Sequence, residues 1–311
     1  MSLTQEQGWV HLFHDQIRLT YQQMESLVKS RLDPKWIHNN VRAAKDYFDR
    51  MGNVVAREEI NPFGQTVPLN PVRSRRATTP RSFNGTVYLS DEHTLRSMTD
   101  GQNEYRDTIV ASLVRAGDKV LLAAAIGSAE TATITAVGAA ISSGTTALPS
   151  GQKTGTGIAT SLAGIILCNL KLSKAAVPSG AGKRLAFYSP GQLTDIMAIT
   201  QASSSDFTKN QIHDKGTIDG LMWQGFTWVE IPDVINPDTT LLDSMLPLVS
   251  TTRSTIFMAR DAMGLTTLQD IETKISPRPD INDAIQVRSV MKLDAVRLFE
   301  GGVVQYDVLE N

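Results

Sequence analysis

The stretch Arg184-Leu-Ala-Phe-Tyr-Ser-Pro-Gly-Gln-Leu193 contains two successive structural patterns. Its first half is an apolar run of the length expected for a buried strand. Ser189 and Pro190 follow, and proline is favoured at the first position of a helix because the N–H that it lacks would have no partner there. The stretch therefore predicts a strand that leads directly into a helix, as in a compact domain that mixes both.

Segments downstream of this stretch also favour strands. Phe226-Thr-Trp-Val-Glu-Ile231 alternates in the manner of a half-buried strand, and Ile256-Phe257-Met258 is a short apolar run. Val287 to Val308 predicts two strands around the turn Glu300-Gly-Gly302. We expect the C-terminal part to be rich in sheet.

Segments upstream favour helices. Thr99-Asp-Gly-Gln102 matches a capping box, in which Thr and Gln side chains satisfy free N–H groups at a helix start. Apolar residues then recur at spacings of three and four: Tyr105, Ile109, Leu113, Ala116, Val120 and Ala124. Gly127-Ser128 ends the pattern, so we expect one helix of about seven turns that acts as a stiff spine. Glu130 to Thr156 favours short strands and loops, and a second helix is predicted from Ile158 to Leu172.

The N-terminal segment shows a helical pattern of its own. Apolar residues from Val10 to Val28 recur at helical spacing, and Asp33-Pro34 ends the pattern, which predicts a helix within Leu3–Val28. Two interpretations stay open. The helix packs on its own domain, or it is an arm that lies across a neighbouring subunit.

Residues 41–89 carry few apolar runs and many chain breakers. The breakers are Gly52, Pro62, Gly64, Pro68, Pro71, Pro80 and Gly85. The short extended pieces between them cannot bury enough apolar surface to offset the entropy cost of ordering the chain. We therefore expect a long extended loop that rests on another surface, and a second copy of the chain would provide one.

Charged residues of this loop are candidate intersubunit contacts. They are Glu58, Glu59, Arg73, Arg75, Arg76 and Arg81. Arginine forms bidentate pairs with carboxylates at interfaces, which favours salt bridges between subunits. The alternative is a solvated loop, where an exposed ion pair contributes about 0–1 kcal/mol. Nucleic-acid binding is a third interpretation, but no aromatic residues alternate with the arginines.

Composition excludes several classes of protein. The 311 residues are 41% hydrophobic, which is enough for a core, and the net charge of -2 gives no general attraction to nucleic acid or anionic membranes. The single Cys168 excludes a disulfide within the chain and favours a buried thiol. The N-terminus lacks a signal-peptide pattern, and no apolar stretch reaches the ~20 residues of a membrane span. We expect a soluble protein of a reducing compartment, without a membrane partner.

Motifs for catalysis are incomplete. Gly180-Ala-Gly-Lys-Arg184 is similar to part of a phosphate-binding loop, but Val177 and Arg184 stand where Gly and Ser or Thr are required. Gly155-Thr-Gly157 lacks the third glycine of a dinucleotide-binding motif. The five histidines provide no recognisable set of three metal ligands. We predict no catalytic, cofactor or metal site, and therefore no enzyme.

An ordered series of segments carries a family resemblance. The segments are Val177-Pro178, Arg184 to Leu193, Gly216-Thr-Ile-Asp-Gly220, Gly225-Phe-Thr-Trp-Val229, Ala295-Val-Arg-Leu298 and Gly302-Val-Val304. In this order they resemble the C-terminal half of tailed-bacteriophage major capsid proteins, whose fold is named after the Hong Kong ninety-seven phage. Tyr47-Phe-Asp-Arg-Met-Gly52 and Thr66 to Arg76 are similar to the extended loop of that family.

The resemblance implies an α+β phage capsid fold with five parts. They are an N-terminal arm (1–40), an extended β loop (41–93), a peripheral domain with a spine helix (94–182), an axial domain (183–285) and C-terminal strands that return to the core (286–311).

The resemblance also implies a function. A major capsid protein of this family self-assembles as hexamers and pentamers into the icosahedral head of the virion, which encloses double-stranded DNA without sequence-specific binding. Expected partners are further copies of the chain, a separate scaffolding protein, a portal and a decoration protein, with assembly in the host bacterial cytoplasm and no cofactor. Two alternatives remain: an encapsulin, which is a cellular cargo shell of the same fold, and a soluble α/β enzyme with its site near Gly155 or Gly180.

Overall fold

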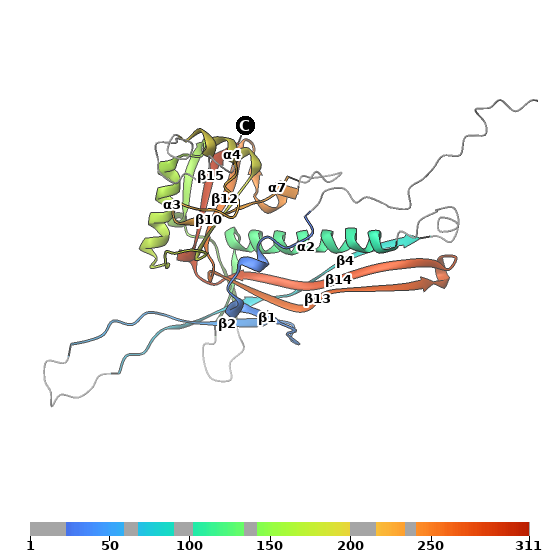
Figure 1. Ribbon diagram of the computed structural model, residues 1–311. Helices are drawn as coiled ribbons and strands as arrows, with labels where there is room; N and C mark the ends of the chain where they lie inside the picture. Colours follow the sequence, from blue (N-terminus) through green and yellow to red (C-terminus); the bar gives the residue numbers. More distant parts are fainter. Residues whose placement is uncertain are drawn as a thin grey trace, which may run out of the picture.

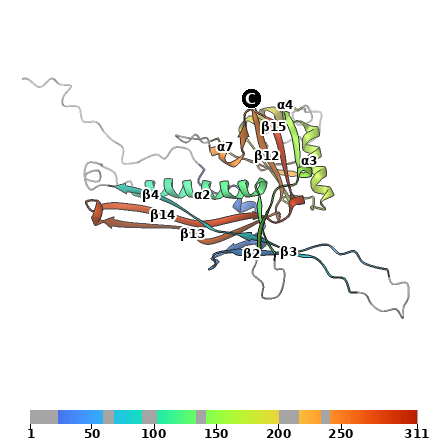
Figure 2. The ribbon, with the colours of Figure 1, turned by 180° about the vertical axis from the view of Figure 1, so that it is seen from behind.

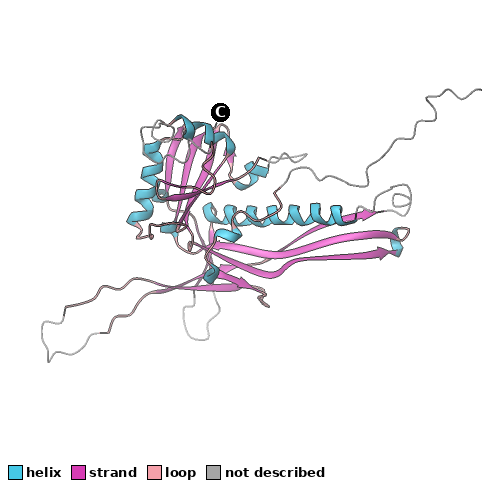
Figure 3. Ribbon diagram, viewed as in Figure 1, coloured by secondary structure: helices cyan, strands magenta, loops and turns pink. Residues whose placement is uncertain are grey.

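The computed structural model describes residues 23–58, 68–89, 102–133, 142–199, 216–233 and 241–310. It shows a long sheet with a helix along it, an upper lobe of mixed helices and strands, and a strand pair that continues into an extended loop (Figure 1). Colouring by secondary structure shows that the longest strands belong to the long sheet and that most helices surround the upper lobe (Figure 3).

The long sheet has four strands in the order β1-β13-β14-β4. Their bounds are β1 Ile37–Asn39, β13 Met263–Arg278, β14 Ala284–Arg297 and β4 Arg81–Leu89. β13 and β14 form an antiparallel hairpin closed by a 3-10 turn, Pro279–Ile281, and β4 pairs with β14 along its whole length.

Helix α2 (Gln102–Ile126) covers one face of this sheet (Figures 1 and 2). Alternate β14 residues, including Val287, Met291 and Leu293, are buried, as expected for a strand with one face against the helix. Gly85 of β4 lies so close to the helix that a Cβ atom there would be 2.5 Å from Cγ2 of Ile109. The contact requires a residue without a side chain at this position.

The upper lobe is built on a second sheet, in the order β7-β15-β12-β8-β10-β9, with β11 beside β12. The strands are β7 Lys153–Ile158, β8 Arg184–Tyr188, β9 Met222–Trp223, β10 Phe226–Glu230, β11 Leu248–Val249, β12 Thr252–Ala259 and β15 Val303–Leu309. The helices are α3 Leu162–Lys174, α4 Pro190–Ala198 and α7 Leu241–Met245.

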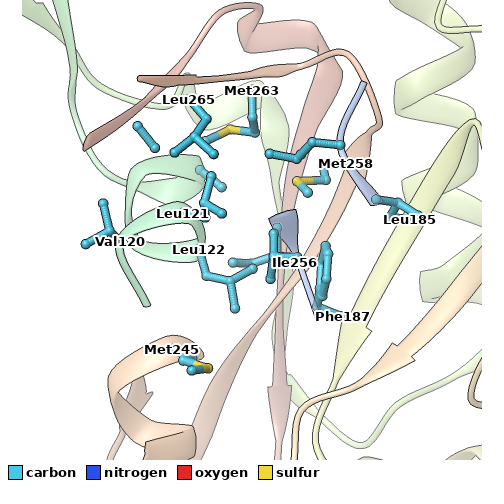
Figure 4. Packing of buried hydrophobic residues seen from close by; sticks show 14 of the residues in the cluster. Val120, Leu121, Leu122, Leu185, Phe187, Met245, Ile256, Met258, Met263 and Leu265 are labelled. Atoms are coloured by element: carbon cyan, nitrogen blue, oxygen red, sulfur yellow. The ribbon is translucent and has the colours of Figure 1, made fainter. Parts of the chain in front are cut away.

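Both faces of the upper sheet are buried, which explains why its strands are apolar runs. One face packs with buried residues of α3 and α4 around Trp228 and Phe257. The opposite face contributes to a core shared with α2 and α7. Figure 4 shows Leu122 of α2 directed toward Ile256 and Phe187. One hydrophobic core therefore joins the lobe to the end of the spine.

A third sheet, in the order β2-β3-β5-β6, forms the base of the extended loop. Its strands are β2 Asp46–Met51, β3 Arg73–Thr78, β5 Ala129–Thr133 and β6 Ser142–Thr146. The pairing continues to Gly52, whose N–H donates to the carbonyl of Val72 at 2.7 Å. Beyond it two arms, residues 53–58 and 68–72, run as irregular chain away from the body (Figures 1 and 2).

Most predicted elements are confirmed. The spine helix ends at Ile126, next to the predicted stop at Gly127. The strand and helix around Ser189 form as β8 and α4, and Ser189 and Gln192 make a full capping box. The second helix starts later than predicted, because Ser161 caps it and Ile158 ends strand β7. The capping box predicted at Thr99 lies outside the described residues.

The predicted N-terminal helix is wrong over residues 23–28, the part of it that the structure describes. Residues 1–22 lie outside the described part, and residues 23–28 are not helical but lead into a 3-10 helix, Lys29–Arg31. The N–H groups of Leu27 and Val28 bond to the Asp118 carboxylate of α2, at 2.9 and 3.4 Å, instead of to carbonyls of their own segment. A tertiary contact thus replaces the local helix.

The predicted domain limits stay predictions. The limit between 285 and 286 falls within β14, whose partner β13 precedes it in the chain. Helix α3, which was predicted together with the spine, packs on the upper lobe. The sequence pattern also missed β13, because its polar residues do not suggest a strand of 16 residues.

Candidate functional site

The arms of the extended loop expose apolar side chains. The exposed fractions are 83% for Val55, 76% for Val72 and 61% for Met51. Val54 and Leu69 on the same arms are also exposed. Because these residues find little cover within the described chain, the arms form a surface suited to contact with another molecule.

The predicted charged residues do not form a single patch. Glu58 is exposed at the end of the described first arm, and Glu59 lies outside the described residues. Arg73 is exposed at the start of β3. Arg75 pairs with Asp49, which lies directly opposite on β2. Glu58, Arg73 and Arg75 thus lie at the base and along the first arm of the loop.

Arg81 and Arg76 have partners within their own chain. Arg81 lies 3.6 Å from Asp294 of β14, and its side chain stays 67% exposed. Arg76 is buried, with only 3% of its side chain exposed, and forms an ion pair with Glu300. The structure therefore places Arg76 in the interior of the subunit. The sequence could have indicated that one of these arginines faces inward, because the consecutive strand residues Arg75 and Arg76 must point to opposite faces of the sheet.

Glu300 joins two arginines of the loop base. Arg50 of β2 donates to the Glu300 carboxylate at 3.2 Å and to the carbonyl of Leu298, and its guanidinium lies 5.8 Å from the ring of Phe299. Burial, and then the positive charges of Arg50 and Arg297, lower the pKa of Arg76 to about 10. Arg76 remains charged at neutral pH, and Glu300 is the carboxylate that balances it.

Arg297 connects the same region to the spine. This residue of β14 is fully buried, and it donates to the carbonyls of Ala125, Gly127 and Thr146 at 2.8, 2.6 and 3.0 Å. Ala125 lies in the last turn of α2, where carbonyl groups lack partners and the helix dipole favours a cation. α2 has no basic residue in its own last turn. Arg297 supplies that charge from the sheet.

Asp118 anchors the N-terminal segment to the middle of the spine. Its carboxylate accepts hydrogen bonds from Gln23 and Ser26 at 2.6 and 2.5 Å, in addition to the two backbone N–H groups. Burial raises the pKa of Asp118, and these hydrogen bonds oppose the rise. The segment is thus held by one buried carboxylate.

The described residues show no constellation for catalysis. No group of three or more His, Cys, Asp or Glu among them is placed to hold a metal ion. The described helices include none that is long and apolar enough to cross a membrane. Burial raises the pKa of the Cys168 thiol to about 12, so it is not a nucleophile at neutral pH. An open groove of about 700 Å³ beside the segment 25–40 is lined by mixed side chains and holds the Lys29–Asp270 ion pair.

A long helix on a long hairpin, an arm of extended loop and a separate mixed lobe define a class of structural subunit that builds shells. Solved structures share this arrangement. The capsid of Ralstonia phage GP4 matches with a TM-score of 0.68 and 14% identity, over 98% of this chain and 96% of that chain. The capsid of cyanophage P-SCSP1u matches with a TM-score of 0.69 and 10% identity, over 98% and 94%.

A third similar structure is the asymmetric unit of the mature capsid of bacteriophage PhiM1, with a TM-score of 0.63 and 10% identity, over 96% of this chain and 92% of that chain. No curated protein sequence matches the chain. A sequence profile described as phage capsid protein matches residues 6–310. The chain therefore belongs to the phage capsid protein family, and the predicted α+β capsid fold is confirmed. It is a major capsid protein of the virion shell, and its family is one of structural proteins.

Proposed function

We propose that this capsid protein tiles the phage head as hexamers and pentamers, in which the extended loop of each copy lies on the next copy. The observation that carries this proposal is the pair of exposed arms, with Val55 and Val72 each more than three-quarters exposed. A loop of this kind gains order only against a partner surface. In a shell made of one chain, that surface belongs to another copy.

The charged candidates take two roles in this proposal. Glu58, Arg73, Arg75 and Arg81 lie at the base and on the first arm of the loop and contact the neighbouring copy. Glu59, which is outside the described residues, is proposed to take part in the same contact. Arg76 acts inside its own subunit, where its ion pair with Glu300 holds the loop base against the β14–β15 connection. The described arms of the loop thus lack regular secondary structure, while ion pairs attach its base to the subunit. Such a loop lets the same contact tolerate the different angles of hexamers and pentamers.

A shell of this kind also needs partners other than copies of the chain. A separate scaffolding protein and a portal would direct shell closure in the bacterial cytoplasm, and a decoration protein would bind the finished shell. The net charge of -2 supports enclosure of double-stranded DNA without tight or sequence-specific binding. The subunit would carry no enzymatic activity of its own.

Electron microscopy of assembled particles tests the proposal. Wild-type protein, expressed with its scaffolding partner, is expected to form closed shells or rings of five and six copies. The double variant Val55→Asp/Val72→Asp should fold with unchanged circular dichroism and melting temperature but fail to assemble, because charge on the arms prevents their burial. The control Val55→Thr/Val72→Thr keeps the shape of both side chains and should still assemble. A wild-type protein that stays monomeric or dimeric when it is expressed with its scaffolding partner would contradict the proposal.

A further inference from the structure

Helix α3 is apolar on two opposite sides. Its inner side is buried against the upper sheet through Ile165, Cys168 and Leu172. Its outer side exposes three large apolar residues: 49% of Ile166, 41% of Leu167 and 46% of Leu170. A surface helix of a globular protein normally carries polar residues on its outer side. The fold of the single chain therefore does not account for the outer residues of α3.

The outer residues follow the spacing of a helix-packing stripe. Ala163, which is also exposed, Ile166, Leu167 and Leu170 follow one another at intervals of three and four. Residues at these intervals lie on one side of a helix and form the seam along which a second helix packs. Both views place α3 at the side of the upper lobe, with no other described helix or strand over its outer side (Figures 1 and 2). The shape of this side suits a partner helix.

Lysines border the stripe. Lys174 lies one turn beyond Leu170, and Nζ of Lys171 donates to the carbonyl of Lys153 on β7 at 2.7 Å. Helix α3 contains no Asp or Glu. Within the part of the chain that the structure describes, none of these three lysines takes part in an ion pair. A helix that packs here therefore gains from acidic residues beside its own apolar stripe.

A second α3 helix does not meet this requirement. Two copies packed face to face would bring both sets of lysines together, and like charges across an interface oppose association. The charge of the surface therefore favours a partner other than the same helix.

The size of the surface favours a weak contact. A helix of 13 residues is about 20 Å long and roughly 10 Å wide, so its outer side offers far less than the ~800 Å² that each partner buries in a stable interface. A partner that binds here holds each subunit weakly and can leave again. Among the partners that a shell needs, a scaffolding protein is the one that binds during assembly only.

We propose that the outer side of α3 binds an acidic amphipathic helix of the separate scaffolding protein. This inference rests on the proposed function, in which such a protein directs shell closure, and it names the surface that this protein contacts. Ile166, Leu167 and Leu170 pack on the apolar stripe of the partner helix, while Lys171 and Lys174 pair with its carboxylates. Contacts that are weak singly act together over many subunits through multivalency.

Photocrosslinking in assembled shells tests the contact. Leu170 is replaced by the photoreactive residue p-benzoylphenylalanine, and the variant is assembled with the scaffolding protein and irradiated. We expect an adduct of one capsid chain with one scaffolding chain. Mass spectrometry should map it to a segment whose apolar residues recur every three or four positions beside Asp or Glu. The same photoreactive residue at Lys183, an exposed position just before β8, is the control and should give no adduct.

The identity of the adduct decides the result. An adduct between two capsid chains would show that another copy covers α3, and an adduct with a decoration protein would show that a protein of the finished shell does so. Either result would overturn the inference. Shells that contain scaffolding protein but yield no adduct from position 170 would overturn it too, because this position lies at the centre of the proposed contact.

Charge reversal gives an independent result. Lys153→Glu/Lys174→Glu should lower the affinity of purified scaffolding protein for the shells about tenfold. Raised ionic strength should weaken binding to wild type in the same direction. Lys119→Glu/Lys183→Glu makes the same change in net charge at other exposed positions and should bind like wild type. Equal affinities of the two double variants would contradict the contact.

Leu170→Ser separates a protein partner from nucleic acid. This variant keeps the lysines but loses apolar area, so it should also weaken binding of the scaffolding protein. A surface that contacts DNA phosphates would depend on the lysines alone, and unchanged binding in Leu170→Ser would therefore overturn the inference. All of these positions are exposed, so the variants should keep the circular dichroism and melting temperature of wild type.

Failure of this contact is distinguishable from failure of the proposed function. Shells whose scaffolding protein does not respond to changes on α3 would overturn the contact and leave the proposed function intact. Absence of shells or rings from wild-type protein expressed with its scaffolding partner would overturn the proposed function, and the contact with it.

Discussion

Arg297 donates a hydrogen bond to the carbonyl of Gly127 at 2.6 Å, although 170 residues separate the two in the chain. The same guanidinium reaches Ala125 and Thr146, so one buried side chain closes the end of the spine helix. The contact therefore joins the end of the helix, the long sheet and strand β6 of the third sheet in one arrangement.

Removal of Arg297 should therefore destabilise the subunit. Arg297→Met fills part of the same volume but leaves three carbonyls without their donor, and we expect a loss of about 2–4 kcal/mol in the free energy of unfolding. Arg288→Met, at an exposed position of the same strand, should change it by less than about 0.5 kcal/mol. Urea denaturation of both variants measures the difference. Equal stabilities would show that the helix end is satisfied by water instead.

Substitution of Glu300 should lower the free energy of unfolding more than substitution of Asp49 does. Glu300→Gln removes the carboxylate that balances Arg50 and Arg76, and leaves buried cations without a counter-charge. Removal of one partner from a buried ion pair costs about 3–5 kcal/mol. By contrast, Asp49→Asn breaks the more exposed pair with Arg75 and should cost about 0–1 kcal/mol.

A double-mutant cycle separates the pair from the single effects. Arg76→Met/Glu300→Met should be more stable than Glu300→Met alone, because the second substitution removes a stranded charge. Thermal unfolding of the four proteins measures this coupling. Additive losses would mean that Arg76 and Glu300 do not depend on one another.

The contribution of Asp118 should depend on pH. Because burial raises its pKa in the folded state, the folded protein holds the proton more tightly than the unfolded chain. The stability that Asp118 contributes is therefore fully present below the pKa of the unfolded chain, about 3.9, and declines as pH rises through the raised folded pKa. Asp118→Asn lacks this dependence, so the difference in unfolding free energy between wild type and variant should narrow from pH 3.5 or so toward neutrality. A difference that widens with pH would contradict a raised pKa.

Gly85 tests the packing of α2 on the long sheet. In Gly85→Ala the new methyl group would overlap Ile109, and overpacking of this kind costs about 1–3 kcal/mol. Adding Ile109→Ala to the same chain should cost less than the sum of the two single losses, because it removes the atom that the new methyl group would overlap. Gly151→Ala is the control, since a Cβ atom there meets nothing within 4 Å. The melting temperatures of the variants report all three effects.

The helices and the order of the elements were predictable because their signals are local. The end of α2 near Gly127 and the capping box of Ser189 and Gln192 depend on residues within one or two turns. The family resemblance rested on the order of such segments and is confirmed. β13 was not predictable, because its polar residues are stabilised by pairing with β14 and show no periodic pattern of their own.

The charged candidate residues show where local reasoning ends. The sequence by itself determined that arginines gather in a loop without a core, and that a loop of this kind needs a partner surface. Only the tertiary structure decided that Arg76 faces inward to Glu300 while its neighbour Arg75 stays at the surface, and that Leu27 and Val28 bond to Asp118 instead of continuing a helix. The physical reason is that the buried ion pair of Arg76 and the hydrogen bonds of Leu27 and Val28 depend on residues 90 or more positions away in the chain, which no local pattern encodes.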